Sequence, residues 1–262
     1  MAEFFEVSIT DGVAVVAMNH PPVNSITDRF ASELMTLLQQ ISIDKSVRVI
    51  IISSLIDGIF MAGADIKMMK EAVKNRDFSR LREASVIKPA FSAIQDMPQP
   101  VIAAINGHAL GGGCELALAC DYRIIAKGKR IGLTEVLLGL IPAAGGTQRI
   151  LRMLPRPIAT RMLLEGAQLD ADEALAVGLV DRVVDGDKLM DEAKKFAGRF
   201  ARGPSKTYAA LKKCMNKGGD MDLAAGLKME EELFFDLIEN SKDSQEGLTA
   251  FLEKRPPVFK GE

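Results

Sequence analysis

Two short apolar runs, residues 47–53 and 101–105, constrain the fold of this chain more than any other feature. Both are rich in valine, isoleucine or alanine and are flanked by polar or turn-forming residues. Continuous apolar runs of this length are typical of strands buried on both faces, as in parallel sheets. A helical apolar pattern lies before each run, and the first such helix is expected to begin behind Thr27, a good N-cap. This order of strands and helices indicates an α/β fold.

Further strands are expected on both sides of these runs. Residues 5–10 and 13–18 alternate in polarity around an Asp-Gly dipeptide, which is typical of a β-hairpin. Residues 121–125 and 129–133 also have the character of strands. The first two thirds of the chain are therefore expected to form a mainly parallel, helix-covered sheet with right-handed crossovers.

After about Thr147 the sequence predicts one helix after another. Two of these helices have an apolar stripe, made of Leu189, Ala193, Phe196 and Phe200 in one and of Leu223, Leu227, Phe234 and Leu237 in the other. Each stripe requires a partner surface, either the sheet or a neighbouring subunit. We divide the chain into a core of residues 1–200 and a C-terminal helical region of residues 201–262.

The charge balance argues against binding to nucleic acid or to a membrane. The 262 residues include 33 Lys and Arg against 35 Asp and Glu, without a long block of one sign. Residues 101–120 are apolar enough to imitate a membrane span, but they contain Glu115. A carboxylate at mid-membrane costs about 3 kcal/mol, so a buried core segment is the better interpretation. The first residues do not resemble a signal peptide.

The cysteines indicate a reducing compartment. Cys114, Cys120 and Cys214 are an odd number without C-x-x-C spacing, and the chain has only two histidines. Neither a disulfide framework nor a metal site is expected from this set. Reduced thiols and a cytoplasmic location are predicted.

The segment from Asn106 to Glu115, Asn-Gly-His-Ala-Leu-Gly-Gly-Gly-Cys-Glu, is the strongest indication of chemistry. It follows a predicted strand and begins a helix, where glycines allow backbone N–H groups to approach a ligand. Gly112 can therefore provide one N–H group of an oxyanion hole. The segment lacks the P-loop ending and the dinucleotide-binding spacing, which disfavours nucleotides. Close packing of helix on strand, without a ligand, is the alternative.

A second segment, residues 60–67, also follows a strand. Asp65 is expected near the start of a helix, which leaves the N–H group of Ala64 free to point outward. Two N–H groups from separate strand ends can converge on one carbonyl oxygen. Taken alone, this segment could equally be an ordinary turn with a helix cap.

Two glutamates are candidates for acid-base chemistry. Glu115 lies in the first turn of an otherwise apolar helix, and Glu135 lies beside an apolar run. Carboxylates are seldom buried in such surroundings without a purpose. The structural alternatives are a helix cap for Glu115 and a solvated turn for Glu135. His108 and His20 are expected to be packed or loop residues.

Together these segments resemble the enoyl-CoA hydratase/isomerase, or crotonase, family. The resemblance rests on Ala-Gly-Ala-Asp-Ile-Lys at 62–67, on the glycine segment ending at Glu115, and on Glu135 in Thr-Glu-x-x-Leu-Gly-x-Ile-Pro. It continues through Gly-Gly-Thr-Gln-Arg at 145–149 and to the C-terminal residues 251–259. It implies a crotonase-like spiral ββα core with a C-terminal helical trimerisation region, and homotrimers or homohexamers.

The resemblance also implies an acyl-CoA substrate and no separate cofactor. By motif position, Ala64 and Gly112 would donate N–H groups to the thioester oxygen. The positions implied to bind substrate or CoA are Ala62, Ala64, Asp65, Ile66, Lys67 and Gly112. Ala143 departs from the glycine that hydratases of the family usually have after Ile-Pro, but it retains an N–H group and function is expected to be kept.

The presence of both glutamates indicates a monofunctional enoyl-CoA hydratase among the members of this family. Such an enzyme adds water reversibly and syn to a 2-enoyl-CoA, giving a 3-hydroxyacyl-CoA. Hydration needs one group to activate water and one to protonate the α-carbon. Glu115 is expected at the water and Glu135 as proton donor, although paired carboxylates titrate together and the roles stay open. The alternatives are a 3-enoyl to 2-enoyl-CoA isomerase and a non-catalytic, RNA-associated member.

Overall fold

The computed structural model describes residues 3–262 and contains two β-sheets. The first sheet has the order β1-β2-β3-β5-β7-β10. Its strands are β1 (Phe5–Thr10), β2 (Val13–Met18), β3 (Val49–Ser54), β5 (Val101–Ile105), β7 (Tyr122–Ala126) and β10 (Arg182–Val184). The hairpin β1-β2 is antiparallel, as predicted, and all other neighbours in this sheet are parallel.

The second sheet is smaller and corrects the prediction of a single sheet. Its order is β4-β6-β8-β9, with strands β4 (Ile59–Met61), β6 (His108–Leu110), β8 (Arg130–Gly132) and β9 (Gln168–Asp170). The predicted strand at 129–133 is β8 of this sheet, so it does not extend the first one. Strands of three residues are too short to show a period in the sequence, which is why β4, β6 and β9 were not predicted.

The two sheets alternate along the chain in the way a crotonase-like core requires. Each of β3, β5 and β7 leads directly into β4, β6 and β8, and each pair is followed by helical structure. Three successive ββα turns therefore wind around the same core, which confirms the fold class. This winding brings the ends of β4, β6 and β8 together, and the loops after them form the candidate site.

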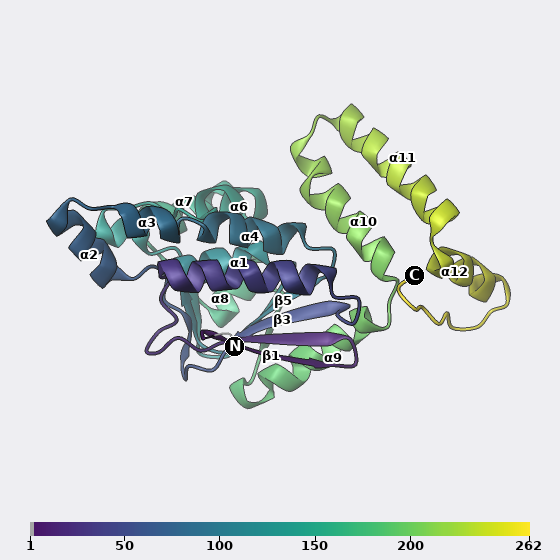
Figure 1. Ribbon diagram of the computed structural model, residues 1–262, viewed down its shortest axis with the longest axis horizontal. Coiled ribbons are helices and arrows are strands. Elements are labelled where there is room, and N and C mark those ends of the chain that lie inside the picture. Colours follow the sequence, from purple (N-terminus) through teal and green to yellow (C-terminus); the bar gives the residue numbers. More distant parts are fainter. Residues whose placement is uncertain (1–2) are drawn as a thin grey trace.

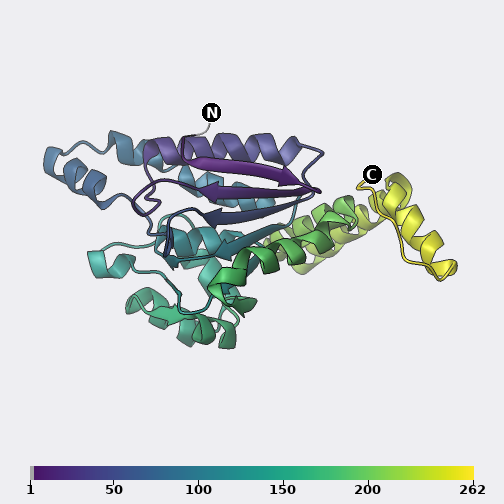
Figure 2. The ribbon, with the colours of Figure 1, turned by 90° about the horizontal axis from the view of Figure 1, so that it is seen from below.

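The inner strands β3 and β5 of the first sheet are buried on both faces, as their apolar runs predict. Ile50 and Ile52 of β3 belong to the main core, whereas Val49 and Ile51 face a second apolar cluster with α9 (Leu189–Ala201). Figures 1 and 2 show α1 (Asp28–Ile43) and α4 (Ile87–Asp96) on one side of the sheet and α9 on the other. Thr27 caps α1, because its Oγ1 accepts a hydrogen bond from the Phe30 amide at 3.2 Å.

Shorter helices cover the rest of the core and connect the strands. These are α2 (Ile66–Asn75), α3 (Ser79–Ala84), α5 (Gly112–Ala119), η1 (Glu135–Leu138), α6 (Gly146–Met153), α7 (Arg156–Leu164), α8 (Ala171–Ala176) and η2 (Gly186–Lys188). The helix η1 is of the 3₁₀ type and follows β8 directly.

The last helices of the chain form an arm that projects from the core (Figures 1 and 2). The arm consists of α10 (Ser205–Asn216), η3 (Gly218–Asp220), α11 (Leu223–Asn240) and α12 (Lys242–Leu252). Lys212 of α10 attaches it to the core, since its buried Nζ donates hydrogen bonds to Asp121 Oδ2 at 2.6 Å and to the Gln99 carbonyl at 2.9 Å.

The two apolar stripes predicted in the helical third have different partners. The first stripe belongs to α9 and packs on the sheet. The second belongs to α11, which the structure describes along its whole length and in which no residue is buried. Leu223 is 78% exposed and Phe234 is 57% exposed, so residues 3–262 leave most of this stripe uncovered.

Among residues 3–262, no helix combines the length and the apolar character that crossing a membrane requires. The three cysteines are free thiols, as predicted. Cys114 and Cys120 lie in the core, whereas Cys214 is only half-buried and belongs to the arm. The cytoplasmic location stays a prediction.

Candidate active site

A pocket of about 640 Å³ brings together six of the residues that the sequence singles out. These residues are Ala62, Ala64, Ile66, Gly112, Glu115 and Glu135. The remaining wall comes from α2 to α4 on one side and from the loop between η1 and α6 on the other. Segments far apart in the sequence therefore meet in one cavity.

Asp65 and Lys67 lie beside this pocket and do not line it. The Asp65 carboxylate caps α2, because Oδ1 accepts hydrogen bonds from the amides of Lys67 at 2.8 Å and Met68 at 3.1 Å. Lys67 is exposed in the first turn of that helix. Their contact with CoA stays a prediction.

The three consecutive glycines have separate structural reasons. Gly111 has φ +53°, a conformation that favours glycine. Gly113 packs against β4, since a Cβ atom there would lie 2.1 Å from the Met61 carbonyl oxygen. Close packing of helix on strand, one of the two interpretations of this segment, is therefore present at Gly113, while Gly112 lines the pocket.

Two backbone amides at the pocket lack a protein acceptor. Gly112 is the first residue of α5 and Ala64 directly precedes the Asp65 cap, so neither N–H group belongs to a helical hydrogen bond. No acceptor among residues 3–262 takes a hydrogen bond from either amide. The loops touch each other, because a Cβ atom on Gly63 would lie 3.0 Å from the Gly112 nitrogen.

Glu115 is buried and held by a loop from elsewhere in the chain. Glu115 is only 3% exposed. Oε1 accepts hydrogen bonds from the amides of Ala144 at 2.7 Å and Gly146 at 2.8 Å. The carboxylate therefore binds outside its own helix, which excludes the helix-cap interpretation. Burial raises the pKa of Glu115, and the two amides and the Arg149 cation oppose that shift.

Glu135 lines the same pocket in very different surroundings. It is the first residue of η1, and its Oε2 is shielded from solvent without a hydrogen-bond partner among residues 3–262. Burial, together with the negative charge of Glu115, raises its pKa to about 7. The solvated-turn interpretation is therefore wrong. A buried carboxyl oxygen without a partner is costly unless a ligand or a water molecule meets it.

These two environments favour different protonation states in the two glutamates. Two backbone N–H groups favour the ionised form of Glu115, whereas Glu135 has lost solvent without gaining comparable donors. Near neutral pH the pocket can therefore hold one carboxylate and one carboxylic acid, which is the pairing that general acid-base chemistry requires.

The loop from Ala143 to Gly146 contributes more to the site than the sequence predicted, since only Ala143 was singled out in it. It supplies both donors to Glu115, and Ala143 itself lines the pocket. The sequence did contain a motif that could have drawn attention to this loop, since the Gly-Gly-Thr-Gln-Arg segment at 145–149 begins in it. Backbone donors leave no trace in residue type, so only coordinates could assign them to Glu115.

The two histidines lie outside the pocket, and His108 belongs to β6. His108 Nδ1 accepts a hydrogen bond from the Arg130 amide at 3.2 Å, and burial lowers its pKa. His20 lies in a loop, with its ring 4.5 Å from that of Phe4 and Nδ1 2.8 Å from the Ser25 carbonyl oxygen.

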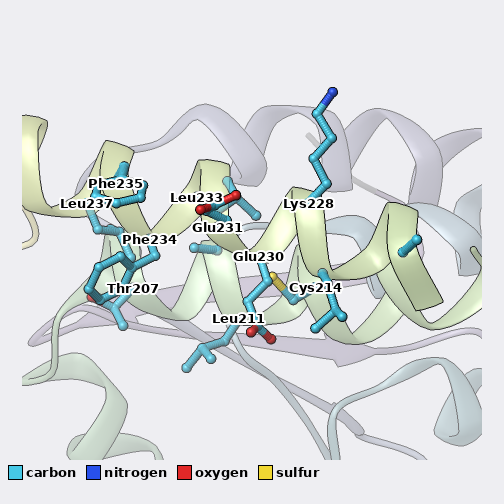
Figure 3. A pocket seen from close by; sticks show the side chains of 13 residues that line it. Thr207, Leu211, Cys214, Lys228, Glu230, Glu231, Leu233, Phe234, Phe235 and Leu237 are labelled. Carbon is cyan, nitrogen blue, oxygen red and sulfur yellow. The ribbon is translucent and has the colours of Figure 1, made fainter.

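A larger apolar groove of about 920 Å³ lies between α10 and α11, away from the two glutamates. Figure 3 shows its labelled side chains, all from the arm, among them Leu211, Cys214, Phe234 and Leu237. We place the chemistry in the smaller pocket, because there the carboxyls and free amides converge. The groove is an apolar surface between two helices.

A family model described as enoyl-CoA hydratase/isomerase matches residues 8–262. Among curated relatives, the chain is 38% identical to a crotonyl-CoA hydratase of Syntrophomonas wolfei, over 94% of both chains. It is 40% identical to the mitochondrial methylglutaconyl-CoA hydratase of Rattus norvegicus, over 96% of this chain and 80% of that one. Among solved structures, it resembles an enoyl-CoA hydratase from Bacillus anthracis with a TM-score of 0.92 and 37% identity, covering 99% of this chain and 100% of the other.

Proposed function

The chain belongs to the enoyl-CoA hydratase/isomerase family, and we propose that it is a hydratase that adds water reversibly and syn to a 2-enoyl-CoA, giving a 3-hydroxyacyl-CoA. The observation that carries this proposal is the pair of glutamates, which line one pocket in opposite environments. Glu115 is held by two amides, while Glu135 has a pKa raised to about 7. The substrate supplies its own coenzyme A, and no separate cofactor takes part.

The free amides of Ala64 and Gly112 are the proposed oxyanion hole. Both donate to the thioester oxygen, which draws electrons from the double bond and makes the β-carbon electrophilic. Donors of this kind are worth about 3 to 4 kcal/mol each in the transition state. Support for this role comes from their position in the pocket and from the lack of a protein acceptor among residues 3–262.

In the proposed reaction the two carboxyls handle different protons, one taken from water and one given to the substrate. Glu115, as carboxylate, takes a proton from the water molecule while the oxygen of that water attacks the β-carbon. Glu135, as acid, delivers a proton to the α-carbon, and the pair finishes with its single proton on Glu115. Proton exchange within the pair or with solvent restores the starting state, and the reverse sequence dehydrates the product.

Crotonyl-CoA tests the proposal, since hydration removes the absorbance of its conjugated enoyl group. We expect turnover by the natural chain, and about 100-fold or greater losses of kcat in E115Q and in E135Q. The control is E165Q, because Glu165 is exposed at the end of α7, away from the pocket. Failure of the natural chain to consume crotonyl-CoA and longer 2-enoyl-CoA substrates would contradict the proposal.

Isomerisation of a 3-enoyl-CoA is the second candidate. Glu135 favours it, since a single partnerless carboxyl with a pKa near 7 can carry a proton between two carbons. An isomerase would retain most of its rate in E115Q and would leave crotonyl-CoA unchanged. The hydrogen-bonded Glu115 in the same pocket makes hydration the preferred function.

A homotrimer or homohexamer is proposed from the arm. The uncovered apolar stripe of α11 and the groove of Figure 3 together form a surface larger than isolated exposed side chains. Association through this surface would cover Phe234 and its neighbours.

A further inference from the structure

Arg149 is a charged residue near Glu115 that the proposed mechanism does not use. It lies in α6 and is half-buried. Its Nη1 donates a hydrogen bond to the Ala144 carbonyl at 2.8 Å, and its Nε donates one to Gln95 Oε1 at 3.0 Å. Both strong contacts are to groups of the protein, and Arg149 does not line the pocket.

The contact of Arg149 with the Ala144 carbonyl matters because of the position of that carbonyl in the loop. It belongs to the peptide between Ala144 and Gly145, and the amides on both sides of that peptide, those of Ala144 and Gly146, hold Glu115 Oε1. A cation fixed on this carbonyl therefore fixes the orientation of both donors. Gly145 permits the arrangement, since a Cβ atom there would lie 2.0 Å from Arg149 Nη1.

A chain of side-chain amides orients the guanidinium in turn. Asn216, the last residue of α10, donates from Nδ2 to the Gln95 carbonyl at 2.7 Å. This leaves its Oδ1 facing Gln95 Nε2, at 3.3 Å, so Gln95 Oε1 points toward Arg149. Each amide has only one orientation that satisfies this chain of donors and acceptors.

We infer that Arg149 is a positioning residue, which holds the loop 143–146 and thereby the Glu115 carboxylate, and that Gln95 and Asn216 orient it from α4 and from the arm. This inference rests on the proposed hydratase function. A carbonyl bound by a cation at this point keeps two amides converging on one oxygen, and the same cation favours a negative charge on Glu115.

The charged and titratable groups around this cluster come from four elements. Arg149 of α6 acts on the carboxylate of Glu115, and that carboxylate in turn acts on Glu135 of η1. Arg149 also interacts with Asp96, the last residue of α4, and with the buried Cys120 thiol, which follows α5. The cation lowers the pKa of Glu115, so its removal should raise that pKa.

The test compares R149M and R149K with R152M, a control on the same helix. Arg152 is exposed and contacts Gln148 and Asp220. With crotonyl-CoA we expect R149M to lose about 10- to 100-fold in kcat, as for loss of a hydrogen bond to a charged group. KM should change less than about 3-fold, because the substrate does not touch Arg149.

The pH profile separates positioning from general structural damage. In R149M the acidic limb of kcat/KM should move to higher pH, because Glu115 loses the cation that favours its ionised form. R149K keeps the positive charge but loses the planar guanidinium with its two sets of donors. The acidic limb of its kcat/KM profile should therefore stay near that of the natural chain, although its kcat falls. N216A should lose about 3- to 10-fold in kcat through misorientation of Gln95.

Carbon NMR of ¹³Cδ-labelled glutamate gives a readout that does not depend on turnover. A rise in the pKa of Glu115 in R149M, absent in R152M, supports the inference even if crotonyl-CoA is not hydrated, in which case the proposed function alone fails. A folded R149M with the kcat, pH profile and Glu115 titration of R152M overturns the inference. If R149M does not fold, R149K and N216A decide by the same comparison, and a kcat and profile equal to those of R152M in both overturn it.

Discussion

At the level of single residues, Glu115 and Glu135 bring the same functional group into one pocket in two different environments. The difference arises from their hydrogen bonds, since one carboxylate receives two backbone donors and the other has an oxygen with none among residues 3–262. Enzymes often set acid and base apart by environment in this way.

The proposed roles predict a bell-shaped dependence of kcat/KM on pH. Glu135 must be protonated to act as acid, so the rate should fall as pH rises through about 7. Glu115 must be ionised, so the rate should also fall as pH drops through its own pKa. Initial rates with crotonyl-CoA across this range measure both limbs. A rate that continues to rise well above neutral pH would contradict the role of Glu135.

The E135Q substitution should stabilise the folded chain at alkaline pH. The pKa of Glu135 is raised in the folded state from 4.5 to about 7, so its contribution to stability is present below 4.5 and is lost as pH rises through 7. The neutral amide avoids this loss, by about 1 to 3 kcal/mol. Thermal unfolding of E135Q and E165Q at two pH values measures it. We expect a higher Tm for E135Q at pH 8 and little difference near pH 4, and the opposite order would refute the argument.

How far the sequence predicted the site depends on the kind of atom involved. The side chains of Glu115 and Glu135 were identified because a carboxylate stands out in an apolar segment, and Asp65 because it could cap a helix. The amides of Ala144 and Gly146 were not, since every residue except proline has such a donor. For Arg149 the sequence showed only its place in the motif at 145–149, because no neighbouring residue indicates that its side chain reaches the Ala144 carbonyl.

At the level of elements, the helix α5 of the candidate site lies very close to the strand β4. Gly113 permits this contact, and its backbone lies next to the Met61 carbonyl of β4. The same contact presents the start of α5, with Gly112 and Glu115, to the pocket.

The G113A substitution should therefore damage both stability and activity. The added methyl would lie 2.1 Å from backbone that cannot move alone, and overpacking of this kind costs about 1 to 3 kcal/mol. The control is G219A, since no atom lies within 4 Å of a Cβ at Gly219, and we expect a change within about 0.5 kcal/mol there. Urea unfolding monitored by circular dichroism compares the two. Equal midpoints would show that α5 does not need this close approach.

The elements that the sequence predicted well are the long or strongly patterned ones. The hairpin, β3, β5 and α1 have residues enough to show a period or a cap. The strands β4, β6 and β9 have three residues each, and β10 was lost in a segment that otherwise indicates helices. Pairing between distant short strands depends on tertiary contacts, so the second sheet became visible only in the structure.

At the level of the whole molecule, the core and the arm differ in what covers their apolar side chains. In the core both faces of β3 and β5 are covered, whereas α11 and α12 leave large apolar groups in solvent. Phe251 is 82% exposed and Leu252 is 81% exposed at the end of α12. Patches of this kind are typical of association surfaces.

Charges placed on the arm should therefore dissociate the proposed oligomer. We expect F234D and F251D to shift the chain toward monomer in sedimentation or light-scattering measurements, because a buried, unpaired carboxylate is costly at an apolar interface. The control is I43D, since Ile43 is 81% exposed at the end of α1, outside the arm. A natural chain that is monomeric at micromolar concentration would contradict the proposed association.

The helix α10 faces both parts of the molecule. One of its faces forms the groove with α11, and its last residue, Asn216, begins the amide chain that ends at Glu115. If further copies of the chain bind to the arm, as proposed, they should also stabilise the loop 143–146 that holds Glu115. Turnover per subunit should then decline when the enzyme is diluted below the concentration at which its copies stay together, and return when it is concentrated again.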